Sequence, residues 1–431
     1  MKRIFVFIVF VANMMVVFAT PSISGISAKQ RWPWSPVVDI DIICDGVGVA
    51  DAILTATYDG SSGNPVELLP GIVEGSPTLG AGHNHLVWDP IKAGLGSVEL
   101  KNFVVSASLV DSALRKYLVI DLMDGSYEYA ANPPSGGWNQ DIYKTRYLVF
   151  RRVPAGTYTL GYTTDQIERF ANLGASNKAY YSDNLAVRTV KVTSDYYMGI
   201  FMATVAQVSN IESYSAGNIK MQPYSAWLSD WRGSMTNGTL GVTWPRDGHR
   251  VATGSITGKL RALCSNSLPP HMIVDLPTEA QWEIAARAGT TTYYPNGGTL
   301  ESSVDDIKAL QDEIGTNRTE NVGLMAANGW GFFDMLGITY EMTLNVCTIG
   351  STISTDNYPV FKVPGQVVDP VGMTVEPNPD LAVVVCNSGW FVRGANYASL
   401  PTNRRAYRMD PDPSKAKASV RFAIHLSPLV K

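Results

Sequence analysis

Short runs of alternating or β-branched residues recur over residues 36–123 of the chain. Breaks rich in Gly, Ser and Asp, such as residues 59–63, separate them. Short strands at regular spacing with turns of this composition are typical of an antiparallel sandwich. We therefore expect a β-sandwich over residues 30–128, with strands at residues 37–42, 52–58, 85–89, 97–105 and 117–122.

A Pro- and Gly-rich segment follows, and the hydrophobic pattern changes after it. Residues 131–138 have the sequence ANPPSGGW, and clusters of Pro and Gly between periodic segments mark loops. Residues 129–145 are therefore the predicted linker, and residues 146–431 the predicted second domain. This domain is rich in turns, and its clearest helix begins after Thr278 as N-cap and ends before Gly289. The predicted fold class is α+β.

The chain begins with a strongly apolar segment. Two positive charges precede an apolar run over residues 4–19. This pattern is typical of a secretory signal, whereas a membrane-spanning helix needs about 20 apolar residues. We expect residues 1–28 to be a signal peptide, cleaved after Ala19 or Ala28, with a retained N-terminal anchor as the alternative. The protein is then secreted, periplasmic or at the cell surface, with no transmembrane segment after signal removal.

Charge and composition exclude several classes of protein. The 431 residues include 34 Lys and Arg against 38 Asp and Glu, a formal net charge of −4. With no basic tract either, nucleic acid is not an expected partner. Four Cys and five His are too few for a zinc-finger array or a disulfide-framed miniprotein. Export permits disulfides, and the sequence leaves open whether Cys347 and Cys386 pair.

Five strings in the second domain carry a family resemblance. They are VPAGTYTLG at residues 153–161, YYMGIFMAT at 196–204, LPTEAQWE with AARAG at 276–289, NGWGFFDMLG at 328–337, and VRGANY at 392–397 with a final VRF at 420–422. In this order they resemble the motifs of the formylglycine-generating (sulfatase-modifying) enzyme family. The resemblance implies a turn-rich C-type-lectin-like fold. The preceding sandwich is similar to the immunoglobulin-like modules of some secreted bacterial members.

The resemblance also implies a chemistry whose key residues are missing from this chain. Oxidases of the family convert a sulfatase Cys into formylglycine with O2 and a copper ion held by two Cys. The matching positions here are Ser399 and Arg404, and no Cys follows Cys386. Copper(I) selects soft thiolates, which neither a hydroxyl nor a permanently protonated guanidinium replaces. We therefore expect no bound copper and no oxidase activity.

A calcium site of the family has matching positions in this chain. They are the side chains of Asp334 and Glu341 and the backbone carbonyls of Gly337 and Thr339. Two carboxylates with carbonyls in a tight turn suit a hard cation that takes six to eight oxygens. The alternative is that Asp334 and Glu341 cap backbone amides and pair with arginines such as Arg393.

The segment after the last long motif is polar and rich in Tyr and Arg. Residues 394–408 have few apolar side chains, and in lectin-like folds the corresponding face holds the ligand. Tyr and Arg are also enriched in binding hot spots. In the alternative, Arg405 and Arg408 are structural arginines of the family. The predicted ligand-binding residues are Asn396, Tyr397, Ser399, Asn403, Arg404, Arg405 and Tyr407.

One close His pair, His83 and His85, lies in the predicted sandwich. Related proteins with the lectin-like fold hold non-haem iron through His residues of an added helical domain. Here the pair is expected in a surface turn, without a carboxylate at facial-triad spacing. An iron or zinc site is the alternative.

The predicted function is therefore binding of a glycan or protein ligand outside the cytoplasm. The first alternative is an enzyme of the same family with an altered metal centre. The second is a scaffold in which both domains mediate assembly. Metal content and O2 consumption distinguish the enzyme from the other two.

Overall fold

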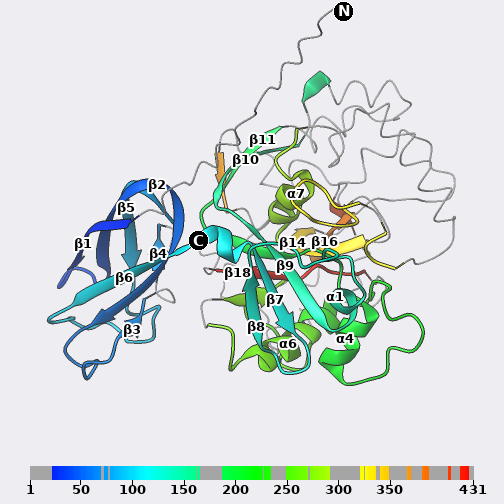
Figure 1. Cartoon of the computed structure of the whole chain (residues 1–431), viewed down its shortest axis with the longest axis horizontal. Coiled ribbons are helices and arrows are strands. Elements are labelled where there is room, and N and C mark those ends of the chain that lie inside the picture. Colours follow the sequence, from blue (N-terminus) through cyan, green and yellow to red (C-terminus); the bar gives the residue numbers. More distant parts are fainter. Residues whose placement is uncertain are drawn as a thin grey trace, which may run out of the picture.

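The structure is a computed structural model of the 431-residue chain (Figure 1). It describes residues 22–68, 72–75, 78–161, 163–165, 187–226, 228–233, 249–269, 272–291, 321–324, 326–335, 340–348, 366–369, 381–387, 406–408 and 418–426. In these ranges the chain consists mainly of strands with few helices, in agreement with an α+β fold. No helix in them is long and apolar enough to cross a membrane.

The N-terminal strands form one six-stranded antiparallel sheet around a long central strand. β2 (Val38–Thr57) pairs through its first half with β1 (Ser22–Gln30) and through its second half with β6 (Val104–Asp111). Its other edge pairs with β5 (Thr78–Trp88) and β3 (Val66–Glu67), and β4 (Ile72–Glu74) pairs with β5. Alternate residues face inward, and they form a core that includes Val38, Ile40, Ile42, Leu54, Leu86 and Trp88.

A second six-stranded antiparallel sheet organises the rest of the chain. Its order is β13 (Ile273–Asp275), β18 (Ala423–His425), β12 (Tyr196–Gly199), β9 (Tyr147–Val153), β7 (Tyr117–Asp121) and β8 (Tyr127–Ala130). The short 3-10 helix η2 (Ser112–Arg115) connects the first sheet to β7.

The predicted boundary between the two domains is wrong in one respect. The strand at residues 117–122 was assigned to the sandwich, but β7 pairs with β9 in the second sheet. Leu118 and Ile120 of β7 pack with Phe150 in a shared core. A period-two pattern predicts a strand and its buried face but not the sheet it joins. The second folding unit therefore begins before residue 129, and the predicted linker holds part of β8 and the short helix α1 (Ile142–Thr145).

Helices and two small sheets complete the second unit. The helices are α4 (Val205–Glu212), α5 (Leu228–Arg232), α6 (Ile256–Cys264) and α7 (Glu279–Arg287). One small sheet contains β10 (Gly156–Leu160), β11 (Arg188–Val192) and β15 (Gln366–Val368). The other contains β14 (Tyr340–Thr348), β16 (Leu381–Asn387) and β17 (Ala406–Arg408).

The predicted helix at residues 279–287 is confirmed. Thr278 accepts a hydrogen bond from the Gln281 amide, and the Gln281 side chain returns one to the Thr278 amide, which completes a capping box. The helix ends with Ala288 in the left-handed region, followed by Gly289 with φ 82°.

The register of β14 and β16 argues against a disulfide between Cys347 and Cys386. Cys347 lies opposite Ala382, whereas Cys386 lies opposite Glu341. The two cysteines are thus near opposite ends of the ladder. A disulfide requires Cα atoms within about 7 Å, and several residues of strand exceed that distance.

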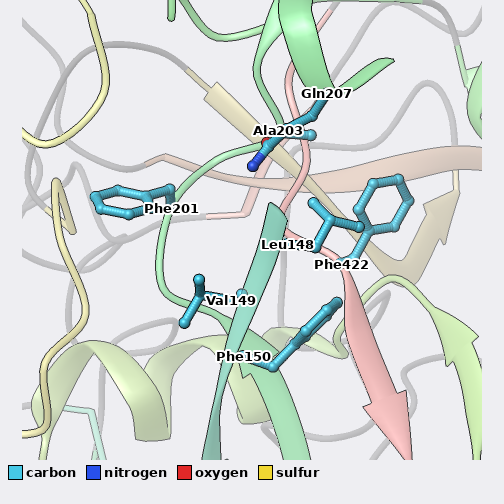
Figure 2. Close-up of a pocket in the computed structure, with 8 residues that line it drawn as sticks. Leu148, Val149, Phe150, Phe201, Ala203, Gln207 and Phe422 are labelled. Carbon is cyan, nitrogen blue, oxygen red and sulfur yellow. The ribbon is translucent and has the colours of Figure 1, made fainter. Parts of the chain in front are cut away.

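Two apolar cores lie on the two faces of the second sheet. Leu148 and Phe150 of β9 face one core, while Val149 and Val153 face the other. A small pocket between β9, β12 and α4 is lined mostly by apolar side chains (Figure 2). Its one polar side chain, Gln207, already donates to the Tyr147 carbonyl at 2.7 Å and accepts the Thr204 amide at 3.0 Å. We interpret this pocket as a packing gap.

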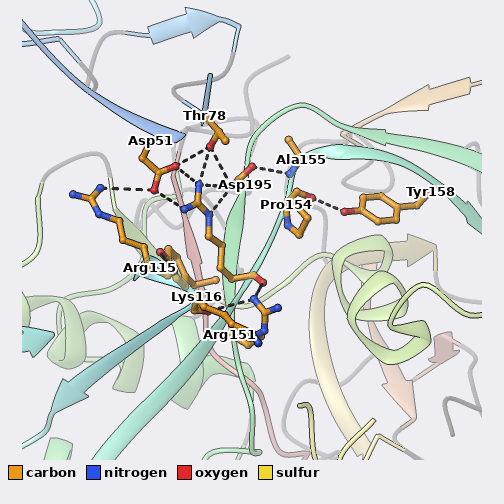
Figure 3. Close-up of polar contacts among 11 residues, drawn as sticks. Asp51, Thr78, Arg115, Lys116, Arg151, Pro154, Ala155, Tyr158 and Asp195 are labelled. Atoms are coloured by element: carbon orange, nitrogen blue, oxygen red, sulfur yellow. Dashed lines mark hydrogen bonds and ion pairs between the residues drawn. The ribbon is translucent and has the colours of Figure 1, made fainter. Parts of the chain in front are cut away.

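A buried charge cluster joins the first sheet to the second (Figure 3). Arg152 of β9 donates through Nη1 to Asp51 Oδ2 at 2.5 Å and through Nε to Asp195 Oδ2 at 2.6 Å. Thr78 of β5 accepts from the same guanidinium at 2.7 Å. Burial alone would lower the pKa of Arg152, but its hydrogen bond to Asp51 and the charges of Asp195 and Asp51 raise it above its usual value. The cation is therefore fixed between the two units.

Replacing Arg152 with Ala should leave two buried carboxylates without the guanidinium they share. Removing one partner from a buried ion pair typically costs about 3–5 kcal/mol, and we expect the free energy of unfolding in urea to fall by that amount. Arg31→Ala is the control, because Arg31 pairs with Asp39 at the surface and exposed pairs contribute little. A loss for Arg152→Ala no larger than that of the control contradicts the assignment.

Candidate functional site

A buried ion pair lies where four of the family-like motifs meet. Arg421 Nε donates to both carboxylate oxygens of Glu341 at 3.0 Å, and Trp282 of α7 donates its indole N–H to Glu341 Oε2 at 3.0 Å. The other guanidinium nitrogens donate to the carbonyls of Ile200 at 2.7 Å and Phe333 at 2.6 Å. Arg421 and Glu341 are completely buried. The Arg421–Glu341 pair thus connects four segments. Arg421 bonds to the residue after β12 and to the loop before Asp334, and Glu341 of β14 bonds to α7.

Asp334 lies close enough to affect the charge of Glu341. Burial raises the pKa of Glu341, Arg421 and Trp282 oppose that rise, and the charge of Asp334 adds to it. Asp334 is fully buried, has a left-handed backbone with φ 56°, and accepts the Gly323 amide at 2.5 Å. Gly323 has φ 80°, and a Cβ there would lie 2.0 Å from Asn139 Oδ1. Only Gly fits this approach to Asp334.

The two predicted calcium-ligating side chains are therefore brought into one buried neighbourhood. Gly337 and Thr339 lie outside the described residues. The contacts of Asp334 and Glu341 also match the alternative, an amide cap and an arginine pair, with Arg421 in the place expected for Arg393. Arg393 itself lies outside the described residues. In the described ranges no group of three or more His, Cys, Asp or Glu residues forms a metal site.

Most of the predicted ligand-binding residues lie outside the described part of the chain. Asn396, Tyr397, Ser399, Asn403, Arg404 and Arg405 lie outside the described residues, and Tyr407 lies in β17 opposite Val385 of β16. The backbone register nevertheless relates this strand to the buried pair. Glu341 of β14 lies opposite Cys386 of β16, which lies opposite Ala406 of β17. The end of the predicted ligand segment is therefore two strands from Glu341 in one sheet.

The His pair lies in a strand, so the predicted surface turn is wrong. His83 and His85 belong to β5, and the Asn84 side chain, which donates to the Gly80 carbonyl at 2.8 Å, supports the glycine-rich stretch that suggested a turn. Asp41, across the sheet on β2, supplies a carboxylate. Its Oδ1 lies 2.9 Å from His83 Nε2 and 2.8 Å from His85 Nδ1. Sequence spacing could not reveal a partner on another strand.

A second buried polar cluster surrounds Asp275, and sequence reasoning did not predict it. Arg232 donates to Asp275 through Nε at 2.7 Å and Nη2 at 2.8 Å, and His249 Nδ1 lies 2.8 Å from Asp275 Oδ2. The His249 ring packs against the His425 ring at 4.5 Å. Burial alone would raise the pKa of Asp275, but the Arg232 charge and the His249 hydrogen bond hold it far below its usual value.

Both imidazoles of this cluster have lowered pKa values. Burial, followed by the charge of His249, lowers the pKa of His425 from 6.5 to about 3. Burial also lowers the pKa of His249, despite its hydrogen bond to Asp275. The cluster lies under β13 and β18 and is fully enclosed. Its role is therefore to hold the sheet edge together.

Comparison with known proteins identifies the second unit. Residues 145–423 match the family model described as the sulfatase-modifying factor enzyme 1-like domain. Over 77 residues the chain is 38% identical to the formylglycine-generating enzyme of Mycobacterium tuberculosis (strain ATCC 25618 / H37Rv), a match covering 16% of this chain and 26% of that protein. The chain thus spans about a quarter of that relative's length.

A solved structure, PvdO from Pseudomonas aeruginosa, aligns with 64% of this chain and 94% of its own length. The identity is 15% and the TM-score 0.36.

The buried imidazoles should make the fold sensitive to acid. Between pH 6.5 and about 3 the unfolded state binds a proton at His425 that the folded state does not. Stability therefore falls as the pH falls through this window, by up to about 1.4 kcal/mol per pH unit for one such group. We expect His425→Gln to show a shallower loss in urea titrations between these pH values.

The surface variant His83→Gln is the control, because the His83 side chain is 61% exposed. It should keep the wild-type slope. Equal slopes for wild type and His425→Gln would contradict the assignment of a neutral buried imidazole.

Proposed function

The chain belongs to the sulfatase-modifying factor enzyme 1-like family, and we propose that it is a binding member of this family without oxidase activity. The observation that carries the proposal is the lack of cysteine thiolates to hold copper. By the motif resemblance, Ser399 and Arg404 match the positions of the copper-binding cysteines, and no Cys follows Cys386. Without thiolates, the site lacks the ligands that copper(I) selects. A site can lose its catalytic groups while the fold that shapes it remains.

The proposed ligand surface is the segment of residues 394–408. Its Tyr, Asn and Arg side chains offer aromatic area and directional donors, which suits a glycan or a protein ligand. The register from Glu341 through Cys386 to Ala406 supports this location, because it ties the end of the segment to a fully buried ion pair. A rigid support reduces the entropy lost on binding.

The proposed setting is outside the cytoplasm. The apolar run at residues 4–19 after two positive charges supports export. Cleavage after Ala19 would keep β1 (Ser22–Gln30) in the mature chain, whereas cleavage after Ala28 would remove most of this strand, which pairs with β2. The N-terminal sheet is then the immunoglobulin-like module of an exported protein, and the ligand is a glycan or protein that such a protein meets at the cell surface or in the surrounding medium.

An enzyme with an altered metal centre is the second candidate. The relative named formylglycine-generating enzyme favours it, since the chain is 38% identical to that protein over 77 residues. Metal analysis of the purified mature protein separates the two candidates. A stoichiometric redox metal supports the enzyme, and its absence together with ligand binding supports the binding protein.

Calcium is proposed as a structural ion at Asp334 and Glu341. The described contacts leave room for it, because a carboxylate has about four lone-pair positions and the donors to Glu341 are one guanidinium N–H and one indole N–H. The raised pKa of Glu341 reflects burial first, and the nearby charge of Asp334 contributes to it. A divalent cation would favour the charged form of both carboxylates.

We expect no conversion of a sulfatase-type Cys peptide by this protein in the presence of copper and O2. The reason is the hydroxyl and guanidinium at positions 399 and 404. Mass spectrometry of the peptide gives the readout, with a protein-free reaction as control. Aldehyde product above that control contradicts the proposal.

Arg404→Ala should weaken ligand binding without unfolding the protein. Glycan and peptide arrays identify the probe, and loss of a charge-assisted hydrogen bond costs about 1.5–3 kcal/mol of binding free energy. Trp34→Ala is the comparison, because Trp34 is an 89% exposed residue of the N-terminal unit. If Trp34→Ala abolishes binding and Arg404→Ala does not, the ligand surface belongs to the N-terminal sheet instead.

Calcium should raise the melting temperature relative to EGTA. A ligand that binds only the folded state adds about 2.7 kcal/mol of stability at 100 times its Kd. Asp334→Asn should remove the response, whereas Asp59→Asn in a surface turn should keep it. An unchanged wild-type melting temperature counts against the ion.

A further inference from the structure

Two cations beside Tyr117 have no acidic partner among the described residues. Arg151 of β9 donates through Nη1 to the backbone carbonyls of Lys116 at 3.3 Å and Arg152 at 2.5 Å, and it also interacts with the Tyr117 hydroxyl. Lys116 forms no ion pair either. The arginines nearby differ in this respect, because Arg152 and Arg115 both contact Asp51. The positive charge of Lys116 and Arg151 is therefore not balanced within the described part of the chain.

The two cations lie against the same aromatic ring. The Arg151 guanidinium carbon is 5.4 Å from the centre of the Tyr117 ring, and Lys116 Nζ is 5.7 Å from it. The hydrogen bond from Arg151 to the Lys116 carbonyl keeps the two residues adjacent, and Figure 3 shows them side by side. Tyr117 itself is only 4% exposed. Lys116 and Arg151 are partly exposed, so the cluster opens to solvent.

Buried donors without acceptors lie in the same neighbourhood. Arg151 Nε and the indole Nε1 of Trp138 are both buried and form no hydrogen bond. The centres of the Trp138 and Tyr117 rings are 5.1 Å apart, and Trp138 is only 6% exposed. Buried donors without partners each cost about 1–3 kcal/mol, and they are rare in folded proteins. Arg151 thus has a donor that no acceptor in the described part of the chain uses.

The electrostatics of Arg151 favour a nearby negative charge. Burial lowers the pKa of its guanidinium, and the charge of neighbouring Arg152 lowers it further, against a rise from Tyr117. Glu128 of β8 lies opposite Val119, two positions along β7 from Tyr117. Glu128 is exposed and forms no ion pair, so it does not neutralise the cluster.

We propose that Lys116 and Arg151 form a binding site for an oxyanion, a sulfate, phosphate or carboxylate group. Its acceptor oxygens pair with the guanidinium and ammonium donors, and charge-assisted bonds of this kind are about twice as strong as neutral ones. The anion comes either as a free ion or as a group on an acidic glycan. Lys116 directly precedes β7 and Arg151 lies in β9, and neither belongs to the ligand segment proposed at residues 394–408.

Isothermal titration of the mature protein with sodium sulfate and sodium phosphate, at ionic strength held constant with chloride, tests the free-ion source. Titration with heparin, and with desulfated heparin as its matched control, tests the glycan source. We expect saturable binding in at least one arm. Lys116→Gln and Arg151→Gln should each weaken it about tenfold or more, and Arg146→Gln by less than about twofold, since Arg146 already pairs with Asp121.

Binding of the free ions would identify the ligand as a small anion. Binding of heparin but not of its desulfated form would identify it as an acidic polymer. No saturable binding in either arm overturns the proposal. Wild-type affinity in the Lys116→Gln variant also overturns it. That variant keeps the test decisive if Arg151→Gln does not fold, because Lys116 forms no ion pair or side-chain hydrogen bond in the described residues.

Discussion

The buried pair of Arg421 and Glu341 is the constraint on which the family domain depends. One guanidinium bonds to a carboxylate and to the carbonyls of Ile200 and Phe333, and the same carboxylate accepts the Trp282 indole. Four segments far apart in sequence are thereby fixed at one point without solvent. A buried charge without its partner is strongly destabilising, so each segment needs the other three in place. This dependence explains how segments outside the six-stranded sheet are held in place.

A buried ion pair also attaches the N-terminal sheet to the family domain. Arg152 comes from the central sheet of the family domain, and Asp51 and Thr78 come from the N-terminal sheet. Because Asp195 shares the same cation, separating the two units would expose or unpair three charged groups. The N-terminal sheet is thus a fixed part of the structure at this contact. A ligand bound to one unit is therefore held in a defined orientation relative to the other unit.

Local features of the fold could be predicted from sequence, and long-range pairings could not. The capping box of Thr278 and Gln281 is a short-range signal, and the helix it begins was predicted correctly. The motif resemblance located Glu341 and Arg421, although not their contact. By contrast, the membership of β7 in the second sheet and the position of Asp41 beside His85 depend on pairing between distant strands. Period-two patterns contain no information about the partner strand.

A double-mutant cycle on Glu341 and Arg421 tests the central claim most directly. The free energy of unfolding would be measured for wild type, Glu341→Gln, Arg421→Gln and the double variant. If the pair joins the segments as described, the double variant is more stable than the sum of the single losses implies, with a coupling energy of about 2 kcal/mol or more. Additive losses, within about 0.5 kcal/mol, would show that the two residues act independently and would contradict the account.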